Sequence, residues 1–409
     1  MHRDPPVSLE QARRLVLDSC TRLAPVEVSL AEAIGHVSAV DVSAPEAVPP
    51  FANTAMDGFA VRSADTSGAP LTLAVLGTLA AGARPDLRVG PGQAIRIMTG
   101  APMPPGADAV VMVERTRPAG EGLVLVEVAA SPGDHVRAAG SDLAEGSVVV
   151  SAGSVLGPGR LGVLASVGLT TIAVVRRPRV GVLSTGDELV SDPRPLLPGE
   201  IRDSNRVSVA AAATESGFDV VDLGTARDDE TAIEAAIRAG VSSCDALLTT
   251  GGVSVGDFDY TKAVLNRLSG GTMRWMEVAI KPARPFAFGT VAGVPVFGLP
   301  GNPVSALVSF ECLARPALRK MAGHSRLERP RAAATADEGF DRRPDGKLYL
   351  LRVIASRDDA GRLHVRSAGG QSSHQLAAMA EANALALVPD GEGIPRGGAV
   401  EVLLLGPEV

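Results

Sequence analysis

The chain has 409 residues, enough for two to four domains that each bury a core, so a single small domain is excluded. Hydrophobic residues make up 45% and charged residues 21%, which is typical of a globular protein and excludes a disordered or collagen-like chain. Aromatic residues are only 3% and the net charge is −7, so we expect no nucleic-acid partner.

The cysteines and the N-terminal residues bear on the compartment. Cys20, Cys244 and Cys312 lie far apart, without the spacing of a redox pair or a zinc cluster, which favours a reducing compartment. The N-terminal residues carry charge and two prolines where a signal peptide would be apolar, and no run reaches the roughly 18 apolar residues of a membrane span. We therefore expect a cytoplasmic protein with no membrane partner.

The N-terminal part of the chain predicts a few helices around a small β domain. Ser8 with Gln11, and Ser29 with Glu32, have the spacing of a capping box, which predicts that a helix begins at each serine. Short apolar runs alternate with turn residues over 71–128, as in a small β domain. Residues 157–167 read as a helix, followed by a short strand and a domain boundary at 176–178.

From residue 179 the pattern becomes strand, turn and helix, repeated. Short continuous apolar runs predict buried strands at 180–183, 218–223, 246–250 and 294–299, and the stretches between them predict helices at 205–216, 229–239 and 303–321. This alternation predicts a doubly wound, mostly parallel sheet, in which ligands bind at the carboxyl ends of the strands. Further strands are expected at 347–355, 363–367, 384–388 and 399–405, in a small terminal β domain.

Three of these strands run into glycine-rich polar loops, at 183–188, 249–260 and 299–305. Glycine allows a phosphate to approach the backbone closely, and Asn302 before Pro303 predicts a helix start whose N–H groups face outward. Each loop alone is better explained as a tight turn between a strand and a helix. Three such loops at one sheet edge favour an anion-binding site.

The same edge also carries charged side chains. The acidic residues are Asp187, Glu188, Asp257 and Asp259, with Asp228 and Asp229 after another strand. Carboxylates repel an anionic ligand unless a cation lies between them, and Mg²⁺ suits carboxylate and phosphate oxygens. Helix capping is the alternative role for Asp228 and Asp229. Lys281, at the end of an apolar run, is a candidate point charge toward phosphate, whereas Arg284 is also explained as a solvated surface residue.

Seven segments of the chain occur together in a specific order. They are residues 50–61, 97–101 with 106–111, 140–142, 184–189, 201–205, 250–260 and 299–305. Together these segments closely resemble the molybdopterin molybdenumtransferase family, which includes the bacterial MoeA proteins and the matching module of gephyrin. The resemblance extends over nearly the whole chain.

The resemblance implies an elongated α/β multidomain fold. A doubly wound, mostly parallel sheet domain similar to MogA and MoaB is expected over 178–326, and a C-terminal β barrel over 327–409. A discontinuous helical linker domain is expected over 1–50 and 140–177, around an inserted β domain over 51–139. The resemblance also implies a homodimer in which the inserted domain of one subunit and the sheet domain of the other enclose the site.

The implied activity is insertion of molybdate into adenylylated molybdopterin, with release of AMP and molybdenum cofactor. The implied chemistry is attack at the pyrophosphate assisted by Mg²⁺, with Lys281 steadying an anionic oxygen. The adenylyltransferase of the same pathway is a candidate partner. Two rival functions stay open: a scaffold that holds molybdopterin without turning it over, and a nucleotide pyrophosphate hydrolase.

By motif position, the implied catalytic residues are Asp57, Thr99, Asp259 and Lys281. The implied substrate-binding residues are Asp142, Ser184, Thr185, Gly186, Glu188, Asn205, Gly251, Gly252, Ser254, Arg284, Pro300, Gly301, Asn302, Arg352 and Ser373. The implied metal ligands are Glu188, Asp228 and Asp259. For Asp57 and Asp142 a purely structural role in a turn is the alternative.

The chain departs from the family pattern at two places. Glu277 stands where a basic residue is usual, four residues before Lys281, and this places an anion near a site for anions. Ala283 and Arg284 stand where Gly-Lys is usual, so the charge there is retained. The first departure is the feature that a divergent, non-catalytic paralogue would show.

Overall fold

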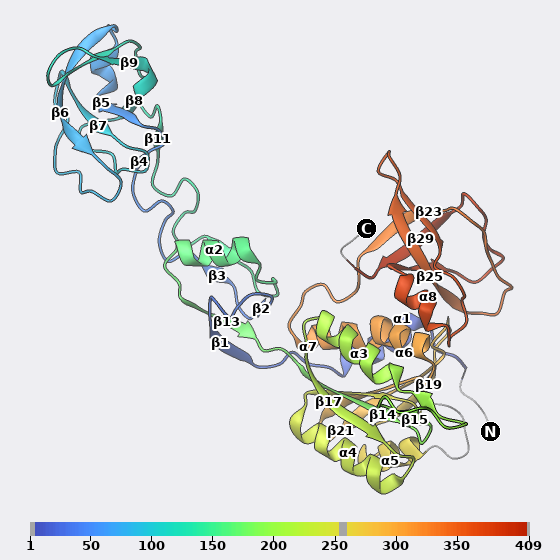
Figure 1. Cartoon of the computed structure of the whole chain (residues 1–409). Coiled ribbons are helices and arrows are strands. Elements are labelled where there is room, and N and C mark those ends of the chain that lie inside the picture. The colour runs from blue at the N-terminus through green and yellow to red at the C-terminus, as the bar shows by residue number, and fades with distance from the viewer. Residues whose placement is uncertain (1–4, 253–259, 407–409) are drawn as a thin grey trace.

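The computed structural model describes residues 5–252 and 260–406. The chain is elongated, with a small β domain at one end, a slender connecting region, and the large sheet with the C-terminal barrel at the other end (Figure 1). Within the described residues, no helix is both long and apolar enough to cross a membrane.

One of the two helices predicted near the N-terminus forms. Helix α1 (Leu9–Asp18) begins after Ser8, and both hydrogen bonds of the predicted capping box with Gln11 are present. The helix predicted at Ser29 is wrong, because Ser29 is the last residue of strand β1 (Pro25–Ser29). Its hydroxyl does donate to Glu32 Oε2 at 2.7 Å, but the chain makes only a turn before Gly35, whose φ of 76° ends it.

The connecting region consists of short antiparallel sheets and one helix. Strand β13 (Thr171–Val175) lies between β1 and β2 (Val37–Ser38), and β3 (Val42–Ser43) pairs with β12 (Val148–Val150). Helix α2 (Pro158–Ser166) fills the position predicted for a helix. Segments from before and after the small β domain are thus hydrogen-bonded to each other.

The small β domain at the far end has a six-stranded sheet. Its strand order is β8 (Ala109–Met112), β5 (Gly58–Val61), β7 (Gln93–Ile97), β6 (Leu71–Leu79), β10 (Leu123–Val126) and β9 (Thr116–Pro118). A separate pair joins β4 (Asn53–Thr54) to β11 (Val136–Arg137), and the 3₁₀ turns are η1 (Ser63–Thr66) and η2 (Val113–Arg115). The β domain expected from the alternating runs is confirmed.

The large sheet is doubly wound and mostly parallel, as predicted. Its order is β17 (Asp219–Ala226), β14 (Arg179–Thr185), β18 (Ala246–Thr250), β22 (Val294–Leu299), β21 (Pro285–Val291) and β19 (Arg274–Glu277). The first four strands are parallel, and β21 and β19 add an antiparallel edge. A small parallel pair, β15 (Leu189–Val190) and β16 (Ile201–Arg202), comes after the loop that ends β14.

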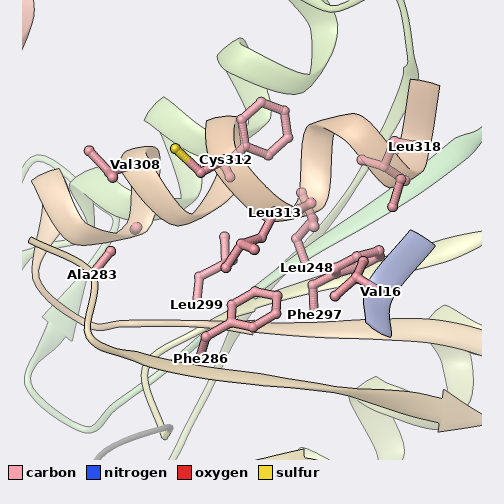
Figure 2. Packing of buried hydrophobic residues seen from close by; sticks show 14 of the residues in the cluster. Val16, Leu248, Ala283, Phe286, Phe297, Leu299, Val308, Cys312, Leu313 and Leu318 are labelled. Atoms are coloured by element: carbon pink, nitrogen blue, oxygen red, sulfur yellow. The ribbon is translucent and has the colours of Figure 1, made fainter. Parts of the chain in front are cut away.

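Helices cover both faces of this sheet because its strands are apolar on both faces. Alternate residues of β14 point to opposite sides, so Val182 joins the core beneath α1, α3 (Ser204–Glu215) and α6 (Pro303–Ser309). Leu183 joins the core beneath α4 (Glu230–Ser243) and α5 (Tyr260–Leu268). Figure 2 shows Phe286, Phe297 and Leu299 of the sheet packed against the helical segment that starts with α6.

The helix predicted over 303–321 contains a π-helical turn. Helix α6 passes into the π turn Phe310–Ala314 and then into α7 (Arg315–Met321). Pro316 has no N–H, and its ring would clash with the carbonyl four residues earlier, so the helix widens there. That carbonyl, of Cys312, accepts a hydrogen bond from Arg13 Nε at 3.0 Å, which satisfies the group that proline leaves without a partner.

The C-terminal region is a closed five-stranded barrel. Its strands are β25 (Leu348–Arg357), β26 (Leu363–Ser367), β23 (Arg331–Ala336), β29 (Ala399–Leu404) and β27 (Ala384–Val388), and pairing of β27 with β25 closes it. Strand β20 (Ile280–Lys281) adds to β25, while β24 (Phe340–Asp341) pairs with β28 (Gly393–Ile394) and α8 (Leu376–Glu381) lies at one end. Strand β20 therefore ties the sheet domain to the barrel.

Candidate functional site

The predicted loops after β14, β18 and β22 meet at one edge of the sheet, because these strands are parallel neighbours. The Ser184 hydroxyl lies 2.9 Å from Thr250 Oγ1, and Gly251 N–H donates to Leu299 O at 3.2 Å. Gly251 has φ 90°, and a Cβ there would lie 2.7 Å from Thr185 O. The loops touch so closely that only glycine fits at this position.

Asp203 connects several segments at this edge through hydrogen bonds of its buried side chain. The sequence motif that contains Asp203 did not predict this role. Its side chain is fully buried and accepts hydrogen bonds from Ser184 Oγ and Thr225 Oγ1, each at 3.0 Å. It also caps α3 through Arg206 N–H and forms an ion pair with Arg206 Nε, both at 3.1 Å. Ser184 and Thr185 are themselves buried, so their side chains support the loops at this edge from inside the domain.

The third loop is fixed by a side chain from α3. Asn205 Nδ2 donates to Gly301 O at 2.7 Å, which links two of the predicted binding segments. Asn302 occupies the position before α6, as predicted, but its side chain makes no capping hydrogen bond. It lines a pocket instead.

That pocket has a volume of about 520 Å³ and lies between the sheet edge and the barrel. Four residues predicted for the site, Lys281, Arg284, Asn302 and Ser373, line it. Others were missed, because only the fold brings the barrel to this edge. They are Lys347, Gln371 and Ser372.

Strand β20 and the loop after it give the pocket two of its cations. The Lys281 side chain is exposed, and Arg284 Nη2 forms a 2.6 Å ion pair with Glu277 Oε2. Ala283, between them in the chain, has φ 76°, a left-handed conformation that favours glycine. The structure therefore places Ala283 in a conformation that glycine adopts without strain, and it shows that Glu277 engages one of the cations of the pocket.

Arg352 lies directly behind the wall formed by the barrel. Its side chain is fully buried, and Nη2 donates to Gly370 O at 2.9 Å and to Ser372 O at 3.2 Å. Nε and Nη1 have no hydrogen-bond partner within the described residues. Burial lowers the pKa of the guanidinium to about 10, and no carboxylate among these residues offsets that effect.

The acidic residues at the edge lie on two facing loops. Asp187 N–H donates to Asp228 Oδ2 at 3.4 Å, and Asp228 N–H donates to Asp187 Oδ1 at 3.2 Å. Asp229 caps α4 by accepting from Ala232 N–H, which is the alternative role considered for it. Residues 5–252 and 260–406 contain no group of three acidic, histidine or cysteine side chains placed to hold a metal. Asp259, Asp257 and Ser254 lie outside the described residues.

The two predicted catalytic residues of the small β domain contact each other. Thr99 donates to Asp57 Oδ1 from its hydroxyl at 2.6 Å and from its backbone N–H at 2.7 Å. These hydrogen bonds hold the pKa of Asp57 below its ordinary value. Asp142 lies in the connecting region, where its N–H donates to Val48 O. Within one chain, Asp57 and Thr99 belong to the domain at the far end from the pocket (Figure 1).

Three family models match the chain in order. The MoeA N-terminal region (domain I and II) matches residues 7–168, a probable molybdopterin binding domain matches 181–320, and the MoeA C-terminal region (domain IV) matches 335–405. The structure is similar to the molybdopterin biosynthesis moeA protein from Pyrococcus horikoshii OT3, with TM-score 0.84, 28% identity, and coverage of 98% of this chain and 100% of that one. Fold and matched regions define a MoeA-type protein.

Two full-length relatives narrow the assignment. Molybdopterin molybdenumtransferase 2 of Mycobacterium tuberculosis is 40% identical over 391 residues, which cover 94% of this chain and 95% of the relative. Molybdopterin molybdenumtransferase of Haemophilus influenzae is 38% identical over 389 residues, covering 95% of each. The chain therefore belongs to the molybdopterin molybdenumtransferase family.

Proposed function

We propose that the protein inserts molybdate into adenylylated molybdopterin and releases AMP and molybdenum cofactor. The observation that carries the proposal is the pocket between sheet and barrel. It is lined by the cations Lys281, Arg284 and Lys347 and by the hydroxyls of Ser305, Ser372 and Ser373. Arg284 and Lys347 form ion pairs with Glu277 and Asp345, which lie outside the lining, so Lys281 is the lining cation for which the described residues show no ion pair. Cations and hydroxyls of this kind suit a small, doubly charged oxyanion such as molybdate.

Arg352 supports the same assignment. Burying a cation without a carboxylate partner costs several kcal/mol of folding free energy, so we expect another interaction to compensate for that cost. A dianion on the other side of the loop that contains Ser372 would offset that cost at long range. Arg352 would also hold this loop in place through its hydrogen bonds to Gly370 and Ser372.

The acidic loops offer part of a donor set for Mg²⁺, which Asp259, outside the described residues, would complete. Asp187, Glu188 and Asp228 offer carboxylate oxygens, the ligands that Mg²⁺ prefers, and none of the three has an ion-pair partner among the described residues. We propose that Glu188 and Asp228 hold the ion together with Asp259. When bound, it would neutralise charge on the pyrophosphate of the substrate.

The substrate would lie along the sheet edge. Gly301, after Pro300, has room where a Cβ would point, so a phosphate can approach the backbone there. Gly186, Gly251 and Gly252 instead let the loops pack closely against neighbouring protein atoms at this edge. The pterin end would then reach toward the pocket where Lys281 faces the oxyanion. Lys281 would stabilise negative charge on that oxyanion as the pyrophosphate bond breaks.

We further propose a homodimer with a shared site. Asp57 and Thr99 contact each other, but they lie in the small β domain, at the opposite end of the molecule from the pocket. A second copy of the chain would therefore have to bring them to the pocket. Mixing Asp57→Ala and Lys281→Met subunits tests this arrangement. After random exchange, about half the dimers carry one intact site, so activity should recover to roughly a quarter of the wild-type value. Proven exchange without recovery would place both residues in one subunit's site.

We propose the adenylyltransferase that makes the adenylylated substrate as a partner, because the product of that enzyme is the substrate proposed for this protein. A cytoplasmic location agrees with Cys20, Cys244 and Cys312, which are all free and buried.

The function is tested by incubating the protein with adenylylated molybdopterin and Mg²⁺, with and without molybdate. We expect AMP release that depends on molybdate. Release at the same rate without molybdate would indicate the pyrophosphate hydrolase. Tight substrate binding with no AMP release would indicate the scaffold.

A further inference from the structure

Lys281 is held by an aromatic residue of the barrel that the sequence did not single out. Strands β20 and β25 are parallel, and their register places Lys281 opposite Tyr349. Lys281 Nζ donates to Tyr349 Oη at 3.3 Å and lies 4.6 Å from the centroid of the ring. Both contacts stabilise an ammonium group: the phenol oxygen accepts a hydrogen bond, and the ring face attracts a cation.

Tyr349 is itself fixed by a buried arginine. The Arg342 guanidinium carbon lies 4.0 Å from the centroid of the Tyr349 ring, and the Arg342 side chain is fully buried. Nη1 of Arg342 donates to the carbonyls of Lys347, Val388 and Pro389. Its Nη2 donates to Asp345 at 2.8 Å and to Asp390 at 2.6 Å. These hydrogen bonds fix the position of the guanidinium, and its stacking contact in turn fixes the position of the Tyr349 ring.

Asp345 fixes the direction of the phenol hydrogen. Tyr349 O–H donates to Asp345 Oδ2 at 3.2 Å, and Lys347 Nζ forms a 2.6 Å ion pair with the same oxygen. The hydrogen bond from Lys347 holds the pKa of Asp345 below its ordinary value, so the carboxylate stays ionised and remains an acceptor. A phenol has one hydrogen to donate, and donating it to Asp345 leaves the oxygen lone pairs for Lys281.

These contacts link the two lysines of the pocket. Lys347 contacts Asp345 directly, and Lys281 reaches the same carboxylate through the Tyr349 hydroxyl. We propose that Tyr349 is a positioning residue, which holds the Lys281 ammonium at the mouth of the pocket for the oxyanion. The inference rests on the proposed function, because it assumes that this pocket takes molybdate.

The test is a double-mutant cycle on molybdate binding, measured by titration calorimetry with molybdate alone and the full-length protein. Tyr349→Phe keeps the ring and its stacking on Arg342 but removes the hydroxyl. We expect it to weaken molybdate binding by about threefold to tenfold, the usual worth of one such hydrogen bond. In a Lys281→Met background the same change should have no effect, because the hydroxyl then has no ammonium to hold.

A control variant separates positioning from general loss of stability. Thr272→Val removes a hydroxyl that bonds Thr290 O at 2.9 Å, outside the pocket lining, and it should leave molybdate affinity unchanged. An equal effect of Tyr349→Phe with and without Lys281, or no effect in the wild-type background while Lys281→Met weakens binding, would overturn the positioning role. If Lys281→Met itself leaves molybdate binding unchanged, the pocket assignment fails, and the role of Tyr349 fails with it.

Discussion

Replacing Asp203 should loosen the edge of the sheet where the three loops meet. The carboxylate is fully buried, caps α3, pairs with Arg206 and accepts from Ser184 and Thr225. Asp203→Ala would take the shared acceptor from Ser184 and Thr225 and one of two carboxylate partners from Arg206, which together costs about 3 kcal/mol. The lost cap adds about 1 kcal/mol, although the two effects are not additive. Asp203→Asn keeps the oxygen that caps α3 but replaces Oδ2, which accepts from Arg206 and Thr225, with an NH2 group, so it should cost about 1.5 to 3 kcal/mol.

Hydrogen exchange read by mass spectrometry on the full chain is the suitable assay, because a multidomain protein does not unfold in one step. Asp203→Ala should lower protection at the start of α3 and in loops 184–188 and 250–252, with peptides of the small β domain as an internal control. Asp222 also pairs with Arg206, but its side chain is 59% exposed, so Asp222→Asn should cost less than about 1 kcal/mol. Equal, small losses of protection in the Asp203 and Asp222 variants would refute this reasoning.

Three further predictions rest on pKa shifts. Thr99→Val removes a hydrogen bond that keeps the pKa of Asp57 low, so an NMR titration should show that pKa rising toward its ordinary value. Burial and nearby arginines lower the pKa of His324 from 6.5 to about 4, so only the unfolded chain takes up this proton between those values. The local stability around His324 should therefore fall by about 3 kcal/mol as the pH drops through this range, and much less in a His324→Gln variant, as followed by hydrogen exchange of the peptides around residue 324. Burial raises the pKa of Cys20 to about 11 and of Cys312 to about 12, so neither thiol should react with iodoacetamide at about pH 8 until the protein unfolds.

The sheet and the edge where its loops meet were predictable because a short continuous apolar run is a local signal of a buried parallel strand. Short apolar runs identified β18 and β22 with the bounds that the structure has, and parallel strands must end at one edge. The prediction of a helix at Ser29 was wrong because a capping box describes only the hydrogen bonds of the first helical turn. Whether the helix continues depends on the residues after that turn, and here Gly35 comes within six residues of Ser29.

The second wall of the pocket was not predictable from pattern. Lys347 and Gln371 reach the sheet edge because β20 leaves the sheet domain and pairs with β25 of the barrel, a contact between segments distant in sequence. The family resemblance pointed to Arg352, but the surroundings of its side chain were not predictable from a sequence pattern either. Its burial without an acidic partner depends on barrel closure, which no local pattern encodes.

The central claim is that release of AMP is coupled to insertion of molybdenum at the pocket that contains Lys281. The direct measurement is the amount of molybdenum incorporated into the pterin product against the amount of AMP released in a single turnover. We expect equal amounts in the wild-type protein and a parallel loss of both in Lys281→Met. AMP released in full while no molybdenum enters the product would contradict it.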